Sequence, residues 1–150
     1  MEEFIVFIDA CRIKCDDLIQ TASQIKSSQE MTLAWRSLQM AKAWLGKVKG
    51  VFNEKNPYYE AQNVASIPET AERYRGVLNI SGDKLKDINL MRSEIQELLL
   101  SFSGKSTAVL WDKYFIINEF TYAVKHLEEA RMWYGFELGN MKEAHKNINK

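Results

Sequence analysis

Four segments of this chain carry apolar residues at alternating intervals of four and three positions, and this spacing constrains the fold more than any other feature. Such intervals bring the apolar side chains onto one face of an α-helix. Each stripe therefore predicts a helix that packs its stripe against another element. We expect an all-α protein. The four stripes are Phe4, Ile8, Cys11, Cys15, Leu18, Ala22, Ile25; Ala34, Leu38, Ala41, Leu45, Val48; Ile88, Met91, Ile95, Leu98, Phe102; and Ile116, Phe120, Ala123, Leu127, Ala130, Tyr134, Leu138, Met141.

The lengths of the connections predict how the helices pair. Ser27-Ser28-Gln29-Glu30 interrupts the first pattern and supplies capping residues. Because a short connection between two striped helices gives an antiparallel pair, residues 1–50 and 83–150 are each expected to form a helical hairpin. The hairpins are expected to pack as a bundle, either as one compact domain or as two linked units. The helices are expected at about 4–25, 30–50 and 84–102, with a fourth that starts between 111 and 115 and ends near 147.

Residues 51–82 differ from the striped segments and form the expected connector between the hairpins. They contain both prolines of the chain, in Asn56-Pro57-Tyr58-Tyr59 and Ile67-Pro68-Glu69-Thr70. A helical turn is expected near 70–77. Long connectors without structure of their own are uncommon in compact domains, so this one is expected to contribute to function.

Charge and cysteine content exclude several classes of protein. Lys plus Arg and Asp plus Glu both number 20, so the chain is not a basic nucleic-acid coat, and an anionic ligand needs a local patch. The apolar run from Phe4 to Ile8 is too short for a secretory signal or a membrane span, so a cytoplasmic protein without a membrane partner is expected. Cys11 and Cys15 lie on one stripe and are expected to be buried, reduced thiols.

The second helix of each expected hairpin repeats the same residues 89 positions apart. Apolar stripes resemble one another, but they do not explain a matched tryptophan, matched glycines and matched cations, so we infer a duplicated hairpin. Glycine inside a helix costs about 1 kcal/mol relative to alanine, so the first glycine pair indicates close approach of a helix or a ligand. The second glycine pair could be C-caps, although the residues after Gly139 can continue the helix. The pairs are Glu30/Glu119, Thr32/Thr121, Ala34/Ala123, Leu38/Leu127, Ala41/Ala130, Trp44/Trp133, Gly46/Gly135 and Gly50/Gly139, with charge preserved at Arg36/Lys125 and Lys42/Arg131.

The stretches 28–34 (SQEMTLA), 38–44 (LQMAKAW) and 127–133 (LEEARMW) resemble the phage helical-hairpin family shared by anti-CBASS and Thoeris anti-defence proteins. Asn56-Pro57-Tyr58 and Ile67-Pro68-Glu69-Thr70 are similar to the tail of longer members. This chain departs from the usual single hairpin by carrying two. The resemblance implies a non-catalytic sponge in the host bacterial cytosol, which sequesters a cyclic nucleotide immune signal at interfaces of a homo-oligomer. With two hairpins a chain, we expect a dimer or trimer.

A cyclic nucleotide needs cations for its phosphates and flat faces for its bases. Each candidate has a second interpretation: the tryptophans could pack at a helix contact, and the cations could form a solvated face. No cofactor and no DNA or RNA partner are expected. The cationic candidates are Arg36, Lys42, Lys47, Arg73, Arg75, Lys125 and Arg131, and the stacking candidates are Trp44, Tyr58, Tyr59, Trp133 and Tyr134.

Two functions of other classes stay open. The apolar stripes alone would suffice for a helical bundle that binds another protein. Glu94 and Glu97 form the Glu-x-x-Glu that begins the metal site of an all-α nucleotide pyrophosphohydrolase. That site needs a Glu-x-x-Asp on the next helix, where the only Asp is Asp112 at its start. We therefore expect a binding protein and not an enzyme.

Overall fold

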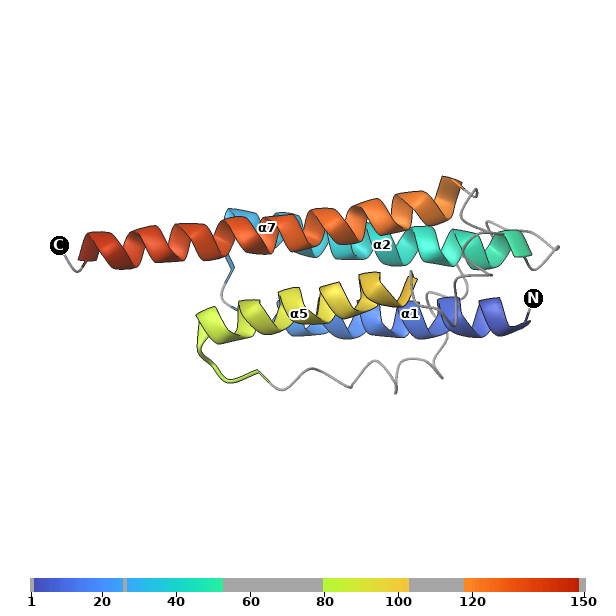
Figure 1. Ribbon diagram of the computed structural model, residues 1–150, viewed down its shortest axis with the longest axis horizontal. Coiled ribbons are helices and arrows are strands. Elements are labelled where there is room, and N and C mark those ends of the chain that lie inside the picture. Colours follow the sequence, from blue (N-terminus) through green and yellow to red (C-terminus); the bar gives the residue numbers. More distant parts are fainter. Residues whose placement is uncertain (1, 26, 53–79, 103–117, 149–150) are drawn as a thin grey trace.

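The computed structural model describes residues 2–25, 27–52, 80–102 and 118–148, and these form an all-helical bundle (Figure 1). Within these ranges there is no strand. The prediction of an all-α fold is confirmed. The four helices are α1 (Glu2–Ala22), α2 (Gln29–Phe52), α5 (Lys84–Phe102) and α7 (Asn118–Ile148).

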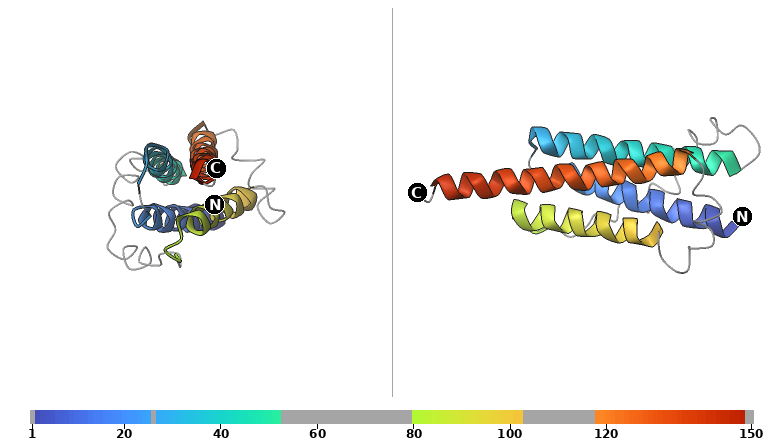
Figure 2. Two further views of the ribbon diagram at one scale, coloured as in Figure 1. Left: turned by 90° about the vertical axis from the view of Figure 1, so that its left-hand side faces the viewer. Right: turned by 45° about the horizontal axis from the view of Figure 1, so that its top comes forward.

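The helices occupy the four corners of a square when the bundle is viewed end-on (Figure 2). α1 packs on α2 and α5 packs on α7, each pair antiparallel, and the most extensive contact joins α2 to α7. The two hairpins therefore pack on each other through the helices that carry the repeat. α2 ends and α5 begins at opposite ends of the bundle, so the two helices run in the same direction.

The apolar stripes meet in one core to which all four helices contribute. Every described stripe residue is buried except Met141, which is partly buried against this core. A fully buried Leu or Ile contributes about 1.5–3 kcal/mol relative to an exposed one, so stripes of this length account for the stability of the bundle. Both cysteines are buried free thiols, and burial raises the pKa of Cys15 to about 12.

Helix ends follow hydrogen bonds to short polar side chains. Ser28 caps α2, because its Oγ accepts a hydrogen bond from the amide of Met31 at 3.2 Å. α1 ends at Ala22, three residues before the predicted end, because Ser23 Oγ donates to the carbonyl of Gln20 and the next amides bond to carbonyls three residues back. Ile25 is nevertheless buried beyond the helix end.

α2 and α7 both continue through the second glycine of the repeat. α2 extends past Gly50 to Phe52, and α7 extends past Gly139 to Ile148. The interpretation of these glycines as C-caps is wrong, because the residues that follow them keep making helical bonds. The predicted start of the fourth helix and the predicted turn near 70–77 lie outside the described residues.

The two hairpins are related by an approximate two-fold axis perpendicular to the bundle. Rotation about it exchanges α1 with α5 and α2 with α7, and it reverses their directions as observed (Figures 1 and 2). The buried positions of α1 and α5 match at an offset of 80, and those of α2 and α7 match at 89. The connection from α5 to α7 is nine residues longer than that from α1 to α2, which accounts for the two offsets. The pairs in the first helices are Ile8/Ile88, Cys11/Met91, Cys15/Ile95, Leu18/Leu98 and Ala22/Phe102.

Candidate functional site

The first hairpin holds an ion pair between its two helices. Nζ of Lys42, on α2, lies 2.9 Å from Oδ1 of Asp16, on α1, and both side chains are largely buried. Arg12 is buried one turn away, and its charge and that of Lys42 act against the rise that burial causes in the pKa of Cys15. The candidate Lys42 thus already has a carboxylate partner, which favours a structural role for it.

The equivalent positions of the second hairpin carry different side chains. The two offsets place Arg92 at the position of Arg12, Gln96 at that of Asp16, and Arg131 at that of Lys42. The guanidinium of Arg92 lies 3.7 Å from the point that a Cβ on Gly135 would occupy. Gln96 lies one turn after Arg92 on α5, and Arg131 lies one turn before Gly135 on α7. Because the two helices are antiparallel, Gln96 is level with Arg131.

Arg92 and Arg131, which we call the arginine pair, have no hydrogen bond or ion pair with any residue that the structure describes. The Nε atom of each is buried, although both side chains are only partly so. A buried guanidinium nitrogen without an acceptor loses its hydration and gains nothing in return. The Nε atom of Arg12 in the first hairpin also lacks a hydrogen-bond partner, but Arg12 has another interaction, which the arginine pair lacks among the described residues.

Gly135 does not show the close backbone approach that its position in a helix predicted. A Cβ there would lie in ordinary van der Waals contact with the side chain of Arg92 from the facing helix. Arg92 was not among the candidates from the sequence. A signal existed: Arg12 and Arg92 stand 80 positions apart, as do the first helices themselves, whereas the repeat was visible only at 89.

Each tryptophan of the repeat packs against an aromatic ring of α7. The ring of Trp44 lies 4.8 Å from that of Tyr122, and Nζ of Lys47 lies 4.6 Å from the centre of a Trp44 ring. Trp133 meets Phe136 edge to face at 5.5 Å. The position of Lys47 in the first hairpin is thus taken by Phe136 in the second.

The remaining candidates are spread over the molecule. Arg36 and Lys125 are exposed on α2 and α7. Tyr134 is fully enclosed by the core, and burial raises the pKa of its hydroxyl. This placement favours packing over contact with a ligand. Tyr58, Tyr59, Arg73 and Arg75 lie outside the described residues.

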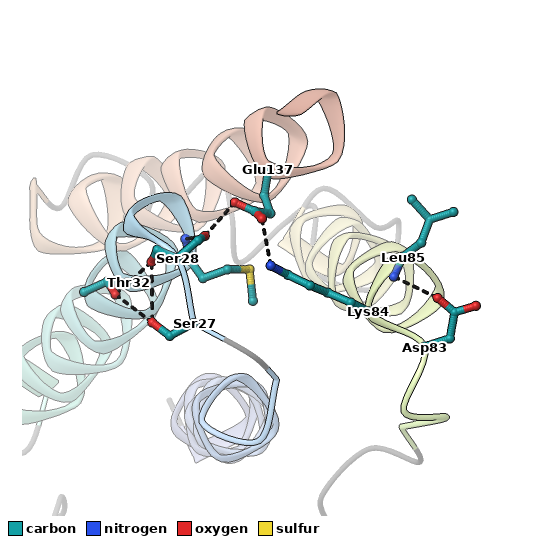
Figure 3. Close-up of polar contacts among 8 residues, drawn as sticks. Ser27, Ser28, Thr32, Asp83, Lys84, Leu85 and Glu137 are labelled. Atoms are coloured by element: carbon teal, nitrogen blue, oxygen red, sulfur yellow. Dashed lines mark hydrogen bonds and ion pairs between the residues drawn. The ribbon is translucent and has the colours of Figure 1, made fainter. Parts of the chain in front are cut away.

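A buried carboxylate ties three helices together at one end of the bundle (Figure 3). Glu137 of α7 accepts a 2.6 Å hydrogen bond from Oγ of Ser28 and a 2.9 Å bond from Nζ of Lys84. Burial alone would raise the pKa of Glu137, but these two donors outweigh it and hold the pKa below its usual value. The equivalent residue of the first hairpin is Val48, so this link exists once.

A pocket of about 290 Å³ lies beside the turn between α1 and α2. Its wall is formed mainly by Ala22, Ile25, Met31 and Trp35, with hydroxyl groups from serine and threonine. No charged side chain lines it among the described residues. Its described lining would fit a flat apolar group and offers hydroxyl groups, but no cation, to a phosphate.

Of the acids considered for a metal site, Glu94 and Glu97 are described, whereas Asp112 lies outside the described residues. Glu94 forms an ion pair with Lys14 of α1, and Glu97 is exposed. In the described part of the chain, no three His, Cys, Asp or Glu side chains are grouped so that they could hold a metal ion.

Two further results concern the class of protein. Across the described ranges, none of the helices combines the length and apolar character that crossing a membrane requires. No protein-family model matches the chain, and neither the curated proteins nor the solved structures contain a significant match to it.

Proposed function

We propose that this protein binds a cyclic nucleotide signal of the cyclic dinucleotide, cyclic trinucleotide or cyclic ADP-ribose type and sequesters it without cleaving it. Its role would be that of a phage protein in the bacterial cytosol that blocks CBASS or Thoeris signalling, acting as a dimer or trimer of chains. The sequence motifs of the repeated helix favour this family of functions.

The observation that carries the proposal is the arginine pair. Arg92 lies beside Gly135 of α7, and Arg131 lies one turn before Gly135 on the same helix. The buried Nε atom of each has no hydrogen-bond partner among the described residues. Guanidinium groups bind phosphates through charge-assisted hydrogen bonds with matching geometry. A ligand phosphate would supply the acceptors that the described residues lack.

The aromatic clusters offer a second part of such a ligand's chemistry. Tyr122 is 44% exposed and Phe136 is 52% exposed, beside the partly buried tryptophans of the repeat. Exposed ring faces stack on nucleobases with about 1–3 kcal/mol per base. These rings and the arginine pair together are what a ligand with both bases and phosphates would need.

The test is a capture and release experiment. The protein is incubated with a panel of cyclic dinucleotides, cyclic trinucleotides and cyclic ADP-ribose isomers, then filtered and heat-denatured, and the small molecules are analysed. Depletion of one signal followed by release of the intact molecule supports sequestration. A converted product would identify an enzyme, and a panel left undepleted would refute the proposal.

A protein-interaction module is the second candidate, and one observation favours it. Met40, Tyr122, Met132 and Phe136 are each 44–52% exposed on α2 and α7. Exposed large apolar side chains are found at protein contacts when they form a patch. Sedimentation of the pure protein with and without a captured nucleotide distinguishes self-association from ligand-dependent assembly.

A further inference from the structure

The arginine pair occurs in one hairpin only, and the comparison with the other hairpin explains why. We propose that the arginine pair is the phosphate-binding site of this protein, and that the first hairpin carries the same site closed by its own carboxylate, Asp16. Each chain then binds one phosphate-bearing ligand at this kind of site. The identity of that ligand rests on the proposed function, whereas the place and number of the sites do not.

The two places correspond residue by residue. In the first hairpin, Asp16 contacts Lys42 at 2.9 Å across the α1–α2 contact. In the second, Arg92 lies beside Gly135, and the antiparallel course of α5 and α7 then places Gln96 level with Arg131. The same register holds in the first hairpin, where Asp16 and Lys42 lie four residues from Arg12 and Gly46, respectively.

A difference of one charge separates the two places. Asp16 places a carboxylate, only 7% exposed, among the cations of the first hairpin. Gln96 is neutral, so the arginine pair keeps both of its charges available. Because Arg92 and Arg131 are only partly buried, an anion can reach them from solvent. Its oxygens would take the place that Asp16 occupies in the first hairpin.

The guanidinium of Arg92 lies beside Gly135 of α7, one turn from Arg131. The two groups can then hold one phosphate between them, which a single exposed arginine does poorly because solvent screens it. Gly46 marks the same place in the first hairpin.

The first experiment introduces a carboxylate beside the arginine pair. Gln96→Asp copies the first hairpin into the second, and Gln96→Asn is the matched control with the same shape and no charge. Inorganic pyrophosphate is titrated by calorimetry into wild type and both variants at low ionic strength. We expect one site per chain in wild type and in Gln96→Asn, and at least ~10-fold weaker binding in Gln96→Asp, since an internal carboxylate competes for the arginines. Equal binding by the two variants, or no binding by wild type, would overturn the proposal.

The second experiment removes the carboxylate from the equivalent place in the first hairpin. Asp16→Gln copies the second hairpin into the first, and Asp16→Glu keeps the charge. We expect Asp16→Gln to bind two pyrophosphates per chain and Asp16→Glu to bind one. A folded Asp16→Gln that binds only one shows that Asp16 is not what closes the first hairpin. Gln96→Asp removes no core contact, so it decides the place of the site even where Asp16→Gln fails to fold.

The same variants separate this inference from the proposed function. Wild type that binds pyrophosphate but captures no cyclic nucleotide would leave the site in place and refute the function. If the Gln96→Asp variant captures a cyclic nucleotide as well as wild type does, the proposed function stands and the proposed site is refuted.

Discussion

The two hairpins of this protein share their packing and differ in their charges. Leu38, Ala41 and Ala34 are fully buried in the first, and so are their equivalents Leu127, Ala130 and Ala123 in the second. At the polar positions the likeness ends: an ion pair joins Lys42 to Asp16, whereas Arg131 faces the position of Gln96.

This difference shows which parts of a duplicated fold are free to diverge. Several matched core positions keep the same residue, as at Leu38/Leu127 and Ala41/Ala130, because the core is densely packed. Others differ in size or charge, as at Ala22/Phe102 and Val48/Glu137. A polar position at the edge of a helix contact only has to be solvated or paired. In the first hairpin Lys42 is paired with Asp16, whereas Arg92 and Arg131 of the second have no hydrogen bond or ion pair with a described residue.

The largest expected effect tests the apolar packing that the two hairpins share. Leu38→Ala and Leu127→Ala should each lower the free energy of unfolding by about 2–5 kcal/mol, because each leaves a cavity in the fully packed α2–α7 contact. Urea denaturation followed by circular dichroism measures both, with the exposed Met40→Ala as the control that should change little. A large loss in only one of the two leucine variants would break the symmetry inferred for the core.

A smaller effect is expected at Glu137, whose hydrogen bonds have no equivalent at Val48 of the first hairpin. Glu137→Gln should lower the free energy of unfolding by about 1.5–3 kcal/mol at pH 7, since hydrogen bonds from Lys84 and Ser28 to a charged acceptor are weakened. The substitution Val48→Ala at the equivalent position tests packing alone and should show no dependence on pH.

The pH dependence of Glu137 has a definite sign. Its pKa in the folded protein lies below the value near 4.5 that it has when unfolded. The stabilisation is therefore complete above about pH 4.5 and is lost as the pH falls through the folded pKa. Wild type and Glu137→Gln should converge in stability in acid, and a difference that stays constant down to pH 2 would show that charge is not involved.

The smallest effect concerns an acid of the first hairpin. Burial raises the pKa of Asp17 to about 6, so its ionised form costs free energy above that pH. Asp17→Asn should raise the melting temperature at pH 7.5, and the gain should disappear near pH 4, where Asp17 is protonated.

The matched control for Asp17 is Glu97→Gln, at the equivalent and exposed position of α5. It should leave the melting temperature nearly unchanged at both pH values. A stabilisation of Asp17→Asn that persists at pH 4 would assign the effect to helix propensity and not to charge.

Most of the fold follows from local patterns in the sequence. Spacings of four and three residues mark the buried faces, and the described stripe residues lie in the core. The helix ends did not follow from the apolar pattern alone. α1 ends three residues before its predicted end, where the polar residue Ser23 makes a side-chain hydrogen bond. The burial of Tyr134 was predicted by its stripe position, whereas its candidacy for stacking came from its residue type alone.

The candidate site followed from the sequence only in part. Arg131 was a candidate because it matches Lys42 in the repeat, but no pattern within one helix shows which of the two has a partner. That depends on Asp16 and Gln96, which belong to the preceding helices and follow a different offset. The nine extra residues between α5 and α7 hid the correspondence of Arg12 with Arg92.

The sequence by itself determined that the chain is helical, which face of each helix is buried, and that the second helices carry matching residues 89 positions apart. These properties depend on residues close together in the chain, through the 3.6-residue period and the hydrophobic effect. Only the tertiary structure decided that these two helices pack on each other and that Lys42 is paired with Asp16, whereas Arg131 has no such partner among the described residues. Electrostatic pairing acts over a few ångströms between side chains far apart in the chain, so it becomes visible only when the helices are placed side by side.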